Sequence, residues 1–271
     1  MKTAVVVGAN GFLGSALLDK LLSQNYNIVA IYNSSFDKIN KLATIYTKAQ
    51  LFESEIQPDY IFYLPGNYSL THSELLELND DLYQYSKKFT NSKMIYISST
   101  NVYGNSNEII TEDSVFNKPG LYAISKISGE FIVSAMKHFA IVRLAYIYGP
   151  GIANKSFIPQ IIDAARNIKK ITLFGKGERK QDYIFIDDAV NLCITCALNQ
   201  NNNIYLGATG ISVSNEEIAQ EIKKHTECDI SFIGEETGKS FYFNPTKTFK
   251  DLDWSPKTTI SEGIKRMLSK F

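Results

Sequence analysis

Short, continuous runs of hydrophobic residues alternate with helical stretches along the first two thirds of the chain. The expected strands are residues 3–7, 27–31, 60–64, 93–97, 140–144 and 203–206, and the helices between them include 12–22, 73–89 and 121–136. Strands that are apolar on both faces are typical of a parallel sheet with helices packed on each side. The pattern therefore predicts an α/β fold built on a doubly wound parallel sheet.

A glycine-rich loop follows the first expected strand, with Gly8, Gly11 and Gly14 at intervals of three residues around Asn10. Glycine at these positions permits a tight turn, a close approach of the backbone to a pyrophosphate, and close packing of the next helix. The helix N-terminus adds free N–H groups and a partial positive charge. The loop predicts a dinucleotide-binding (Rossmann) domain, with an ordinary strand–helix turn as the alternative.

The residues after the second expected strand bear on which dinucleotide is bound. An Asp or Glu at the strand end would bind the ribose 2′-hydroxyl and repel a 2′-phosphate. This chain has Tyr32, Asn33, Ser34 and Ser35 there, followed by Lys38. These donors favour NADP over NAD as the cofactor, with Asn33 and Ser34 as contacts. A polar loop without a phosphate role is the alternative.

The strand–helix rhythm loosens from about residue 150, and the stretch 175–178 is rich in turn residues. A chain of 271 residues is long enough for about two domains. We expect residues 1–149 and about 183–207 to form the dinucleotide-binding domain. Residues from about 150 to 182 and from 208 to 271 are expected to form a smaller substrate-binding region.

The composition excludes several classes of function. Lys and Arg number 28, as do Asp and Glu, and this zero net charge argues against binding to nucleic acid or to an anionic membrane surface. No apolar run reaches the ~20 residues of a membrane span. Cys193 and Cys196 lie in a buried-helix pattern that predicts core packing over redox or metal chemistry. We expect a cytoplasmic protein without a metal site, in which His72, His138 and His225 lie at the surface or in packing positions.

Tyr122 and Lys126 lie four residues apart in an expected helix, and so they share one helix face. An ammonium beside a phenol favours the phenolate, and the pKa of a free phenol is about 10. A lowering of about three units, roughly 4 kcal/mol, would let Tyr122 exchange a proton at neutral pH. The pair predicts general acid/base chemistry, with a solvated helix face as the alternative.

In their order along the chain, these features resemble the extended short-chain dehydrogenase/reductase family of nucleotide-sugar epimerases, dehydratases and ketoreductases. The resemblance rests on the glycine loop, the Tyr122–Lys126 pair, and the stretches 97–104 (ISSTNVYG), 143–151 (RLAYIYGPG), 181–188 (QDYIFIDD) and 252–256 (LDWSP). It extends over essentially the whole chain.

The resemblance implies a role for each matching position. Tyr122 would be the general acid/base at the sugar carbon that exchanges hydride, and Lys126 would hold the nicotinamide ribose and lower the pKa of Tyr122. Ser99 would donate to the substrate oxygen, supported by Thr100. Tyr146 and Gln181 would lie at the substrate. The expected cofactor contacts are Gly8, Asn10, Gly11, Phe12, Leu13, Gly14, Asn33, Ser34, Leu64, Pro65, Gly66, Asn79, Tyr122, Lys126 and Leu144.

Departures from the family pattern narrow the expected reaction. Dehydratases of the family carry an Asp-Glu pair where this chain has Thr100 and Asn101, so elimination of water is not expected. The Arg and Asn that serve the substrate diphosphate in the family are Gln181 and Tyr146 here. The chain is also short for the family, which implies a smaller substrate cap.

Three functions are therefore weighed. The first is an NADP-dependent reductase of a nucleotide-linked 4-ketosugar, the second an epimerase that retains NAD, and the third a non-catalytic NAD(P)-binding sensor or scaffold. The absence of an acid at the end of the second expected strand and the smaller substrate cap favour the reductase. The presence of Ser99, Tyr122 and Lys126 argues against the non-catalytic sensor or scaffold. A nucleotide sugar is the expected partner, and a homodimer is an open alternative to a monomer.

Overall fold

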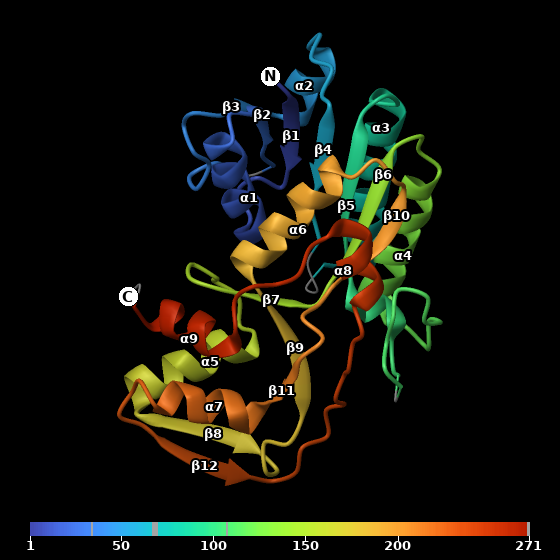
Figure 1. Ribbon diagram of the computed structural model, residues 1–271. Coiled ribbons are helices and arrows are strands. Elements are labelled where there is room, and N and C mark those ends of the chain that lie inside the picture. The colour runs from blue at the N-terminus through green and yellow to red at the C-terminus, as the bar shows by residue number, and fades with distance from the viewer. Residues whose placement is uncertain (34, 67–69, 107, 270–271) are drawn as a thin grey trace. The chain divides into compact units, whose positions relative to one another are not determined.

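The computed structural model describes residues 1–33, 35–66, 70–106 and 108–269, and its chain path is drawn in Figure 1. The chain divides into two compact units. Unit 1 consists of Met1–Gly104, Ser114–Leu144 and Ala189–Gly207, and unit 2 consists of Asn105–Asp113, Ala145–Asp188 and Ala208–Phe271. The assignment of one unit to the cofactor and the other to the substrate stays a prediction.

A seven-stranded sheet is the framework of unit 1 in the described part of the chain, in the order β10-β6-β5-β4-β1-β2-β3. The strands are β1 (Thr3–Val7), β2 (Asn27–Ile31), β3 (Thr44–Tyr46), β4 (Tyr60–Tyr63), β5 (Lys93–Ser99), β6 (Phe139–Leu144) and β10 (Asn203–Gly207). Each of these pairings is parallel. The order reverses between β1 and β4, the place where open parallel sheets bind ligands. The predicted doubly wound α/β fold is confirmed.

The helices of unit 1 follow the strands that the sequence pattern predicts. They are α1 (Phe12–Ser23), α2 (Lys48–Glu53), α3 (His72–Lys88), the short 3-10 helix η1 (Thr100–Tyr103) and α4 (Leu121–Ser134), while α6 (Ile186–Leu198) runs from unit 2 into unit 1. Thr71 begins α3 with a capping box, because its hydroxyl accepts from the Glu74 N–H while the Glu74 carboxylate accepts from the Thr71 N–H. Helices α3 and α4 pack side by side (Figure 1).

The core of unit 1 is formed by apolar side chains from the central strands and from α3. Val5, Val29, Ile61 and Ile141 are almost wholly buried, and Tyr85 packs against them from α3. Residues 3–7 and 27–31 form strands with the predicted bounds, because each ends in four consecutive apolar residues that are buried. Strand β3 was not predicted, since it has three residues and is only partly buried.

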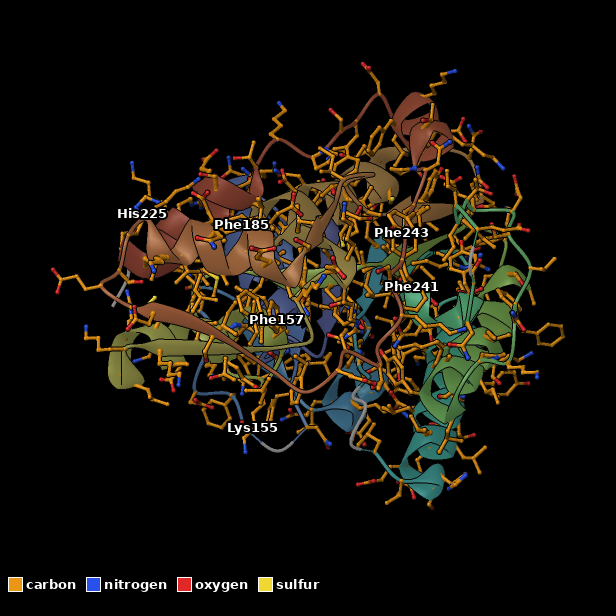
Figure 2. The ribbon with its side chains drawn as sticks, turned by 90° about the horizontal axis from the view of Figure 1, so that it is seen from below. Lys155, Phe157, Phe185, His225, Phe241 and Phe243 are labelled. Carbon is orange, nitrogen blue, oxygen red and sulfur yellow. The ribbon has the colours of Figure 1, made fainter. Side chains whose placement is uncertain are left out.

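Unit 2 has shorter elements, as the loosened rhythm of the sequence predicts. They are β7 (Tyr146–Tyr148), α5 (Phe157–Asp163), a π-helical turn η2 (Ala164–Ile168), β8 (Lys170–Phe174), β9 (Lys180–Phe185), β11 (Ser212–Ser214), α7 (Asn215–Lys223), β12 (Asp229–Ile233), α8 (Thr246–Leu252) and α9 (Ile260–Ser269). Strands β11, β9 and β7 form one small sheet, and β12 pairs with β8 in another. Figure 2 labels Phe157 at the start of α5, Phe185 at the end of β9 and His225 just after α7.

The unit boundaries differ from the sequence expectation at residues 105–113, 145–149 and 183–188, all of which lie in unit 2. The first segment is tied there by long-range bonds: Ile110 donates its N–H to the Tyr242 carbonyl and accepts from the Asn244 N–H, both at 2.8 Å. The other two belong together because β7 pairs with β9. In the described ranges, no helix is long and apolar enough to cross a membrane.

Candidate active site

The glycine loop forms the tight turn that its spacing predicts. Gly8 has φ +83°, a conformation that favours glycine, and its carbonyl oxygen accepts from the Gly11 N–H at 3.0 Å. A Cβ on Gly14 would lie 2.1 Å from that same oxygen, so only glycine lets α1 start this close to β1. Gly11 is the N-cap of α1; in the described part no side chain caps this terminus and no acid lies in the first turn. Its N–H groups are thus available to an anion.

Asn10 links this loop to the segment that follows β2. Its amide nitrogen donates to Ser35 Oγ at 2.8 Å and to Asp37 Oδ1 at 3.2 Å, and its oxygen accepts from the Lys38 N–H at 2.8 Å. The bond from Asn10 lowers the pKa of Asp37, which keeps that carboxylate ionised. Asp37 was missed by the sequence argument, which sought an acid at the strand end itself. Ser34 lies outside the described residues.

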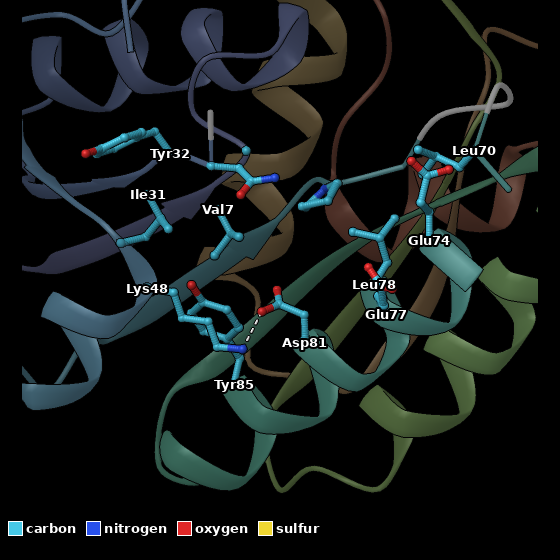
Figure 3. A pocket seen from close by; sticks show the side chains of 13 residues that line it. Val7, Ile31, Tyr32, Lys48, Leu70, Glu74, Glu77, Leu78, Asp81 and Tyr85 are labelled. Atoms are coloured by element: carbon cyan, nitrogen blue, oxygen red, sulfur yellow. Dashed lines mark hydrogen bonds and ion pairs between the residues drawn. The ribbon is translucent and has the colours of Figure 1, made fainter. Parts of the chain in front are cut away.

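A cavity of about 540 Å³ lies at the carboxyl ends of β1, β2 and β4, and its second wall is α3. The predicted cofactor residues Gly8, Asn33 and Pro65 line it together with Tyr32. Figure 3 shows Val7 and Ile31 on the strand side, facing the side chains of α3. The cavity thus lies where a doubly wound sheet binds a dinucleotide.

The charges along this cavity are mainly negative. Glu74, Glu77 and Asp81 line it from α3, and Lys48 is the one cation among its described lining residues. Figure 3 shows Lys48 reaching across to Asp81, with which it forms an ion pair at 2.5 Å. Hydrogen bonds from Thr71 lower the pKa of Glu74, so that its carboxylate is ionised. A negative group brought next to these carboxylates would therefore be repelled.

A smaller crevice of about 10 Å³ gathers the next set of predicted residues. Pro65, Gly66, Asn79, Tyr122 and Lys126 line it. The Asn79 amide donates to Ser125 Oγ at 3.2 Å, and this bond joins α3 to α4. The expected catalytic helix and the expected cofactor path therefore meet in unit 1.

Lys126 is the most constrained of these side chains. Its ammonium donates to the carbonyls of Pro65 and Ile97, each at 2.8 Å, and lies 5.0 Å from the centroid of the Tyr96 ring. Burial lowers the pKa of Lys126 to about 7, opposed by the negative charge of Glu130. A lysine with this pKa can change its charge near neutral pH.

Tyr122 and Lys126 converge on Gly66. A Cβ placed on Gly66 would lie 2.6 Å from Lys126 Nζ and 3.5 Å from the Tyr122 hydroxyl. The ammonium also lies 5.8 Å from the centroid of the Tyr122 ring. A side chain at residue 66 would crowd the Lys126 ammonium, whereas the Tyr122 hydroxyl would be in ordinary contact with it.

Ser99 is the last residue of β5 and is buried at the carboxyl edge of the sheet. Its Oγ accepts from the Asn101 N–H at 3.2 Å and so caps η1, in which Thr100 is also buried. Leu144 is the register partner of Ser99 on β6. The strand ends thus place Ser99, Thr100 and Leu144 together.

Phe12, Leu13 and Leu64 are three more of the predicted cofactor contacts, and the structure places each of them. Phe12 and Leu13 open α1, and Leu13 is buried. The Leu64 N–H donates to the Val7 carbonyl at 3.2 Å, which extends the pairing of β1 and β4 by one bond.

The predicted substrate residues Tyr146 and Gln181 belong to unit 2, where each has a local partner. The Tyr183 hydroxyl donates to Gln181 Oε1 at 2.9 Å, and the Tyr146 and Tyr183 rings lie 5.9 Å apart. Gln181 is buried. A neutral amide engaged in this way offers no charge to a diphosphate.

The two cysteines with C-x-x-C spacing lie in the interior of the protein. Cys193 and Cys196 are free and wholly buried in α6, as core packing requires. Across the described residues, no group of three or more His, Cys, Asp or Glu is arranged to hold a metal ion. Sequence reasoning also passed over the buried Glu130–Arg143 pair, although Glu130 stands one turn beyond Lys126 on the same helix.

The residues present fit a dinucleotide. A Cβ at Gly14 would collide with the glycine loop, so the loop and α1 are close together. In the described part, no side chain caps the N-terminus of α1. The cavity lies where the strand order reverses. Backbone N–H groups and a helix dipole suit a pyrophosphate, and the apolar side chains of Val7, Ile31 and Leu78 in the cavity suit the aromatic rings of a dinucleotide.

Comparisons with known proteins show the family and the fold of the chain. The profile of the NAD dependent epimerase/dehydratase family matches residues 4–207. A putative UDP-glucose 4-epimerase of Methanocaldococcus jannaschii is 24% identical, with 98% of this chain and 97% of that protein covered. CDP-abequose synthase of Salmonella typhimurium is 25% identical, with 98% and 97% covered. The crystal structure of UDP-glucose 4-epimerase with UDP-glucose from Thermotoga maritima has a TM-score of 0.86 at 22% identity, with 98% and 97% covered.

Proposed function

The chain belongs to the NAD dependent epimerase/dehydratase family, and from this premise we propose that it reduces a ketone on a nucleotide-linked sugar. It is an NAD(P)-dependent enzyme of the extended short-chain dehydrogenase/reductase type that acts on sugar nucleotides. The observation that carries the proposal is the convergence of the Tyr122 hydroxyl and Lys126 Nζ at Gly66. We propose that the ketone lies at C4 of the sugar, so that the reaction is a 4-ketosugar reduction.

The proposed roles follow from the chemistry of each side chain. When bound, the nicotinamide supplies the hydride. Tyr122 gives its hydroxyl proton to the oxygen of the former ketone, and Ser99 holds that oxygen by a hydrogen bond. Lys126 stabilises the resulting phenolate by its charge and binds the neighbouring ribose hydroxyls. The sugar ketone gains one hydride and one proton, and Tyr122 recovers its proton from solvent.

The neighbours of Ser99 support reduction over elimination of water. Thr100 and Asn101 follow it in η1, and neither can act as the carboxylic acid or carboxylate base that dehydration needs. Gln181 and Tyr146 bear no charge, and Gln181 is already engaged by Tyr183. An epimerase must hold the diphosphate while the sugar turns over. Weak binding of the diphosphate therefore favours a single reduction.

An epimerase remains the second candidate because of one specific observation. The chain is similar over 98% of its length to a putative UDP-glucose 4-epimerase. An enzyme of this kind would oxidise and re-reduce the same carbon, with its cofactor unchanged after each cycle.

For the cofactor, we propose NAD over NADP. Asp37 lies against the glycine loop through Asn10, and Glu74, Glu77 and Asp81 line the adjoining cavity. A 2′-phosphate carries about −1.5 to −2 charges at neutral pH and would be repelled there. The NADP preference inferred from the residues after β2 stays a prediction, and calorimetric titration with NADH and NADPH decides between the two.

The test is a measurement of stoichiometry. Purified protein is mixed with a 4-keto-6-deoxy sugar nucleotide and either NADH or NADPH, and cofactor oxidation is compared with product formed. One cofactor oxidised per product molecule supports the reductase. Interconversion of two sugar nucleotides without added cofactor would overturn it and establish the epimerase.

We also propose a homodimer that forms through α3 and α4. Leu76 and Tyr83 on α3 and Ile124 and Phe131 on α4 are between 50% and 79% exposed, and each pair is spaced seven residues apart on its helix. Such apolar side chains in water mark a contact surface. Light scattering should give twice the mass of 30.5 kDa, and Phe131→Glu should return the monomer. We further propose a cytoplasmic location, in keeping with the free, buried thiols.

A further inference from the structure

A buried ion pair lies behind the proposed catalytic residues in unit 1. Arg143 on β6 binds Glu130 on α4 through two parallel bonds, Nε to Oε1 at 2.9 Å and Nη2 to Oε2 at 2.7 Å. Only 4% of Arg143 and 6% of Glu130 is exposed. Glu130 stands one helical turn after Lys126, so both project from the same side of α4.

Hydroxyl groups from the strand and turn that contain the catalytic serine complete the pair. Ser98 Oγ donates to Glu130 Oε1 at 2.5 Å, and Arg143 Nη1 donates to the Tyr103 hydroxyl at 3.0 Å. The guanidinium also lies 5.0 Å from the Tyr103 ring centroid and 5.1 Å from that of Phe116. The pair therefore joins α4, β5, η1 and β6.

Stability alone does not account for such a pair. Replacing a buried ion pair by apolar side chains of similar volume is often neutral or stabilising, because the charges lose their hydration on burial. Three consecutive residues of β5 suggest another reason. The Ile97 carbonyl accepts from Lys126, the Ser98 hydroxyl binds Glu130, and Ser99 is the proposed catalytic hydroxyl.

We propose that the Glu130–Arg143 pair is a positioning device, which fixes α4 on β5 and so places Tyr122 and Lys126 relative to Ser99. The inference deepens the proposed function and rests on it for the roles of those three side chains. Two successive turns of α4 are held by three successive residues of one strand, so a rotation or slide of the helix must break both attachments. Glu130 and Arg143 touch no substrate in this scheme and act through the helix.

The same pair acts on the charge of Lys126. Burial lowers the pKa of Lys126 and the Glu130 carboxylate raises it, so removal of that carboxylate alone should lower the pKa further. A loosened helix would instead let water in and raise the pKa toward that of an exposed lysine. The charged and titratable groups around Lys126 are Glu130, Arg143 beyond it, and the phenols of Tyr63, Tyr96 and Tyr122. The two causes therefore predict opposite shifts.

The deciding experiment is the titration of Lys126 by ¹³C NMR of Cε-labelled lysine in the ligand-free full chain. The resonance is assigned by its loss in Lys126→Met. In Glu130→Gln the midpoint should rise by at least about half a pH unit, because α4 loses its attachment to β5 and β6 and water reaches Lys126. Glu53→Gln, the same change at an exposed position of unit 1, should leave it unmoved. An unchanged or lowered midpoint in Glu130→Gln would overturn the proposal, because it would mean that α4 keeps Lys126 buried without the pair.

Kinetics give an independent readout. Glu130→Gln should lower kcat by about tenfold to a hundredfold with KM within about twofold, since a shift of about 1 Å in a reacting group has effects of this size. Ser98→Ala removes one attachment and keeps the pair, so it should show a smaller fall and serves if Glu130→Gln does not fold. A kcat equal to that of wild type in Ser98→Ala and Glu130→Gln would refute positioning. A wild-type protein without turnover would refute the proposed function, and the titration would still decide whether Glu130 holds α4 in place.

Discussion

The ammonium of Lys126 donates a hydrogen bond to the carbonyl oxygen of Pro65 at 2.8 Å, and so joins α4 to the segment that follows β4. A second bond of the same length runs to the Ile97 carbonyl at the end of β5. These two carbonyls replace the water that burial removes, and the pKa of Lys126 is still lowered to about 7. One side chain thus links the stability of unit 1 to pH.

Lys126 should make the ligand-free protein more stable as pH rises from about 7 to 10.5. In that window the unfolded chain, with a lysine pKa of 10.5, binds a proton that the folded chain, with a pKa of about 7, does not. The free energy of unfolding therefore increases with pH there, and the gain is lost progressively as pH falls from 10.5 to about 7, below which both states carry the proton. Lys126→Met removes this titration. Denaturant midpoints of both proteins should diverge in favour of wild type across the window, and a constant difference would contradict the pKa.

Tyr122→Phe should abolish turnover while cofactor binding remains. The change removes only the hydroxyl that exchanges the proton, so kcat should fall by at least about a hundredfold. Calorimetric titration should give a cofactor affinity within about twofold of wild type, because Lys126 and the glycine loop are untouched. Tyr242→Phe, the same change at a tyrosine of unit 2 that is 44% exposed, is the control. A rate of more than a few per cent of wild type would show that another group moves the proton.

Gly14→Ala should damage the cofactor site. The added Cβ would lie 2.1 Å from the Gly8 carbonyl, so α1 must move away from β1. We expect a loss of about 1–3 kcal/mol in stability and at least a tenfold loss of cofactor affinity. Gly120→Ala at the N-cap of α4 is the matched control, since a Cβ there meets no atom within 4 Å. Its cost should be at most about 1 kcal/mol, with cofactor affinity unchanged. Equal effects of Gly14→Ala and Gly120→Ala would refute the close approach of α1 to β1 at Gly14.

NADH should bind more tightly than NADPH. A 2′-phosphate bound near the residues that follow β2 would be repelled by the Asp37 carboxylate. Asp37→Ala should narrow the difference, and Tyr32→Asp should widen it by adding an acid at the end of β2. Calorimetric titration with both cofactors measures this, with Glu53→Ala as a control for loss of an exposed carboxylate in unit 1. Tighter binding of NADPH by wild type would restore the preference inferred from the residues after β2.

Much of the candidate site follows from short-range patterns. Gly8, Gly11 and Gly14 mark the loop because their spacing is local, and Tyr122 and Lys126 share a face because a helix repeats every 3.6 residues. Asp37 was not predicted, because its contact with Asn10 depends on the fold and not on a local pattern. It lies beyond the end of β2, and only the fold of the segment that contains it brings its carboxylate to Asn10.

The sequence by itself determined the parallel sheet, the glycine turn and the pairing of Tyr122 with Lys126, because hydrophobic runs, glycine spacing and helical periodicity act over a few residues. The tertiary structure decided what surrounds them. Residues 65, 97 and 126 are far apart in the chain, and they meet because parallel strands bring their carboxyl ends to one edge, where α4 begins beside them. The partnership of Glu130 with Arg143 likewise depends on how α4 packs on the sheet. Such contacts depend on packing between distant segments, which no local pattern encodes.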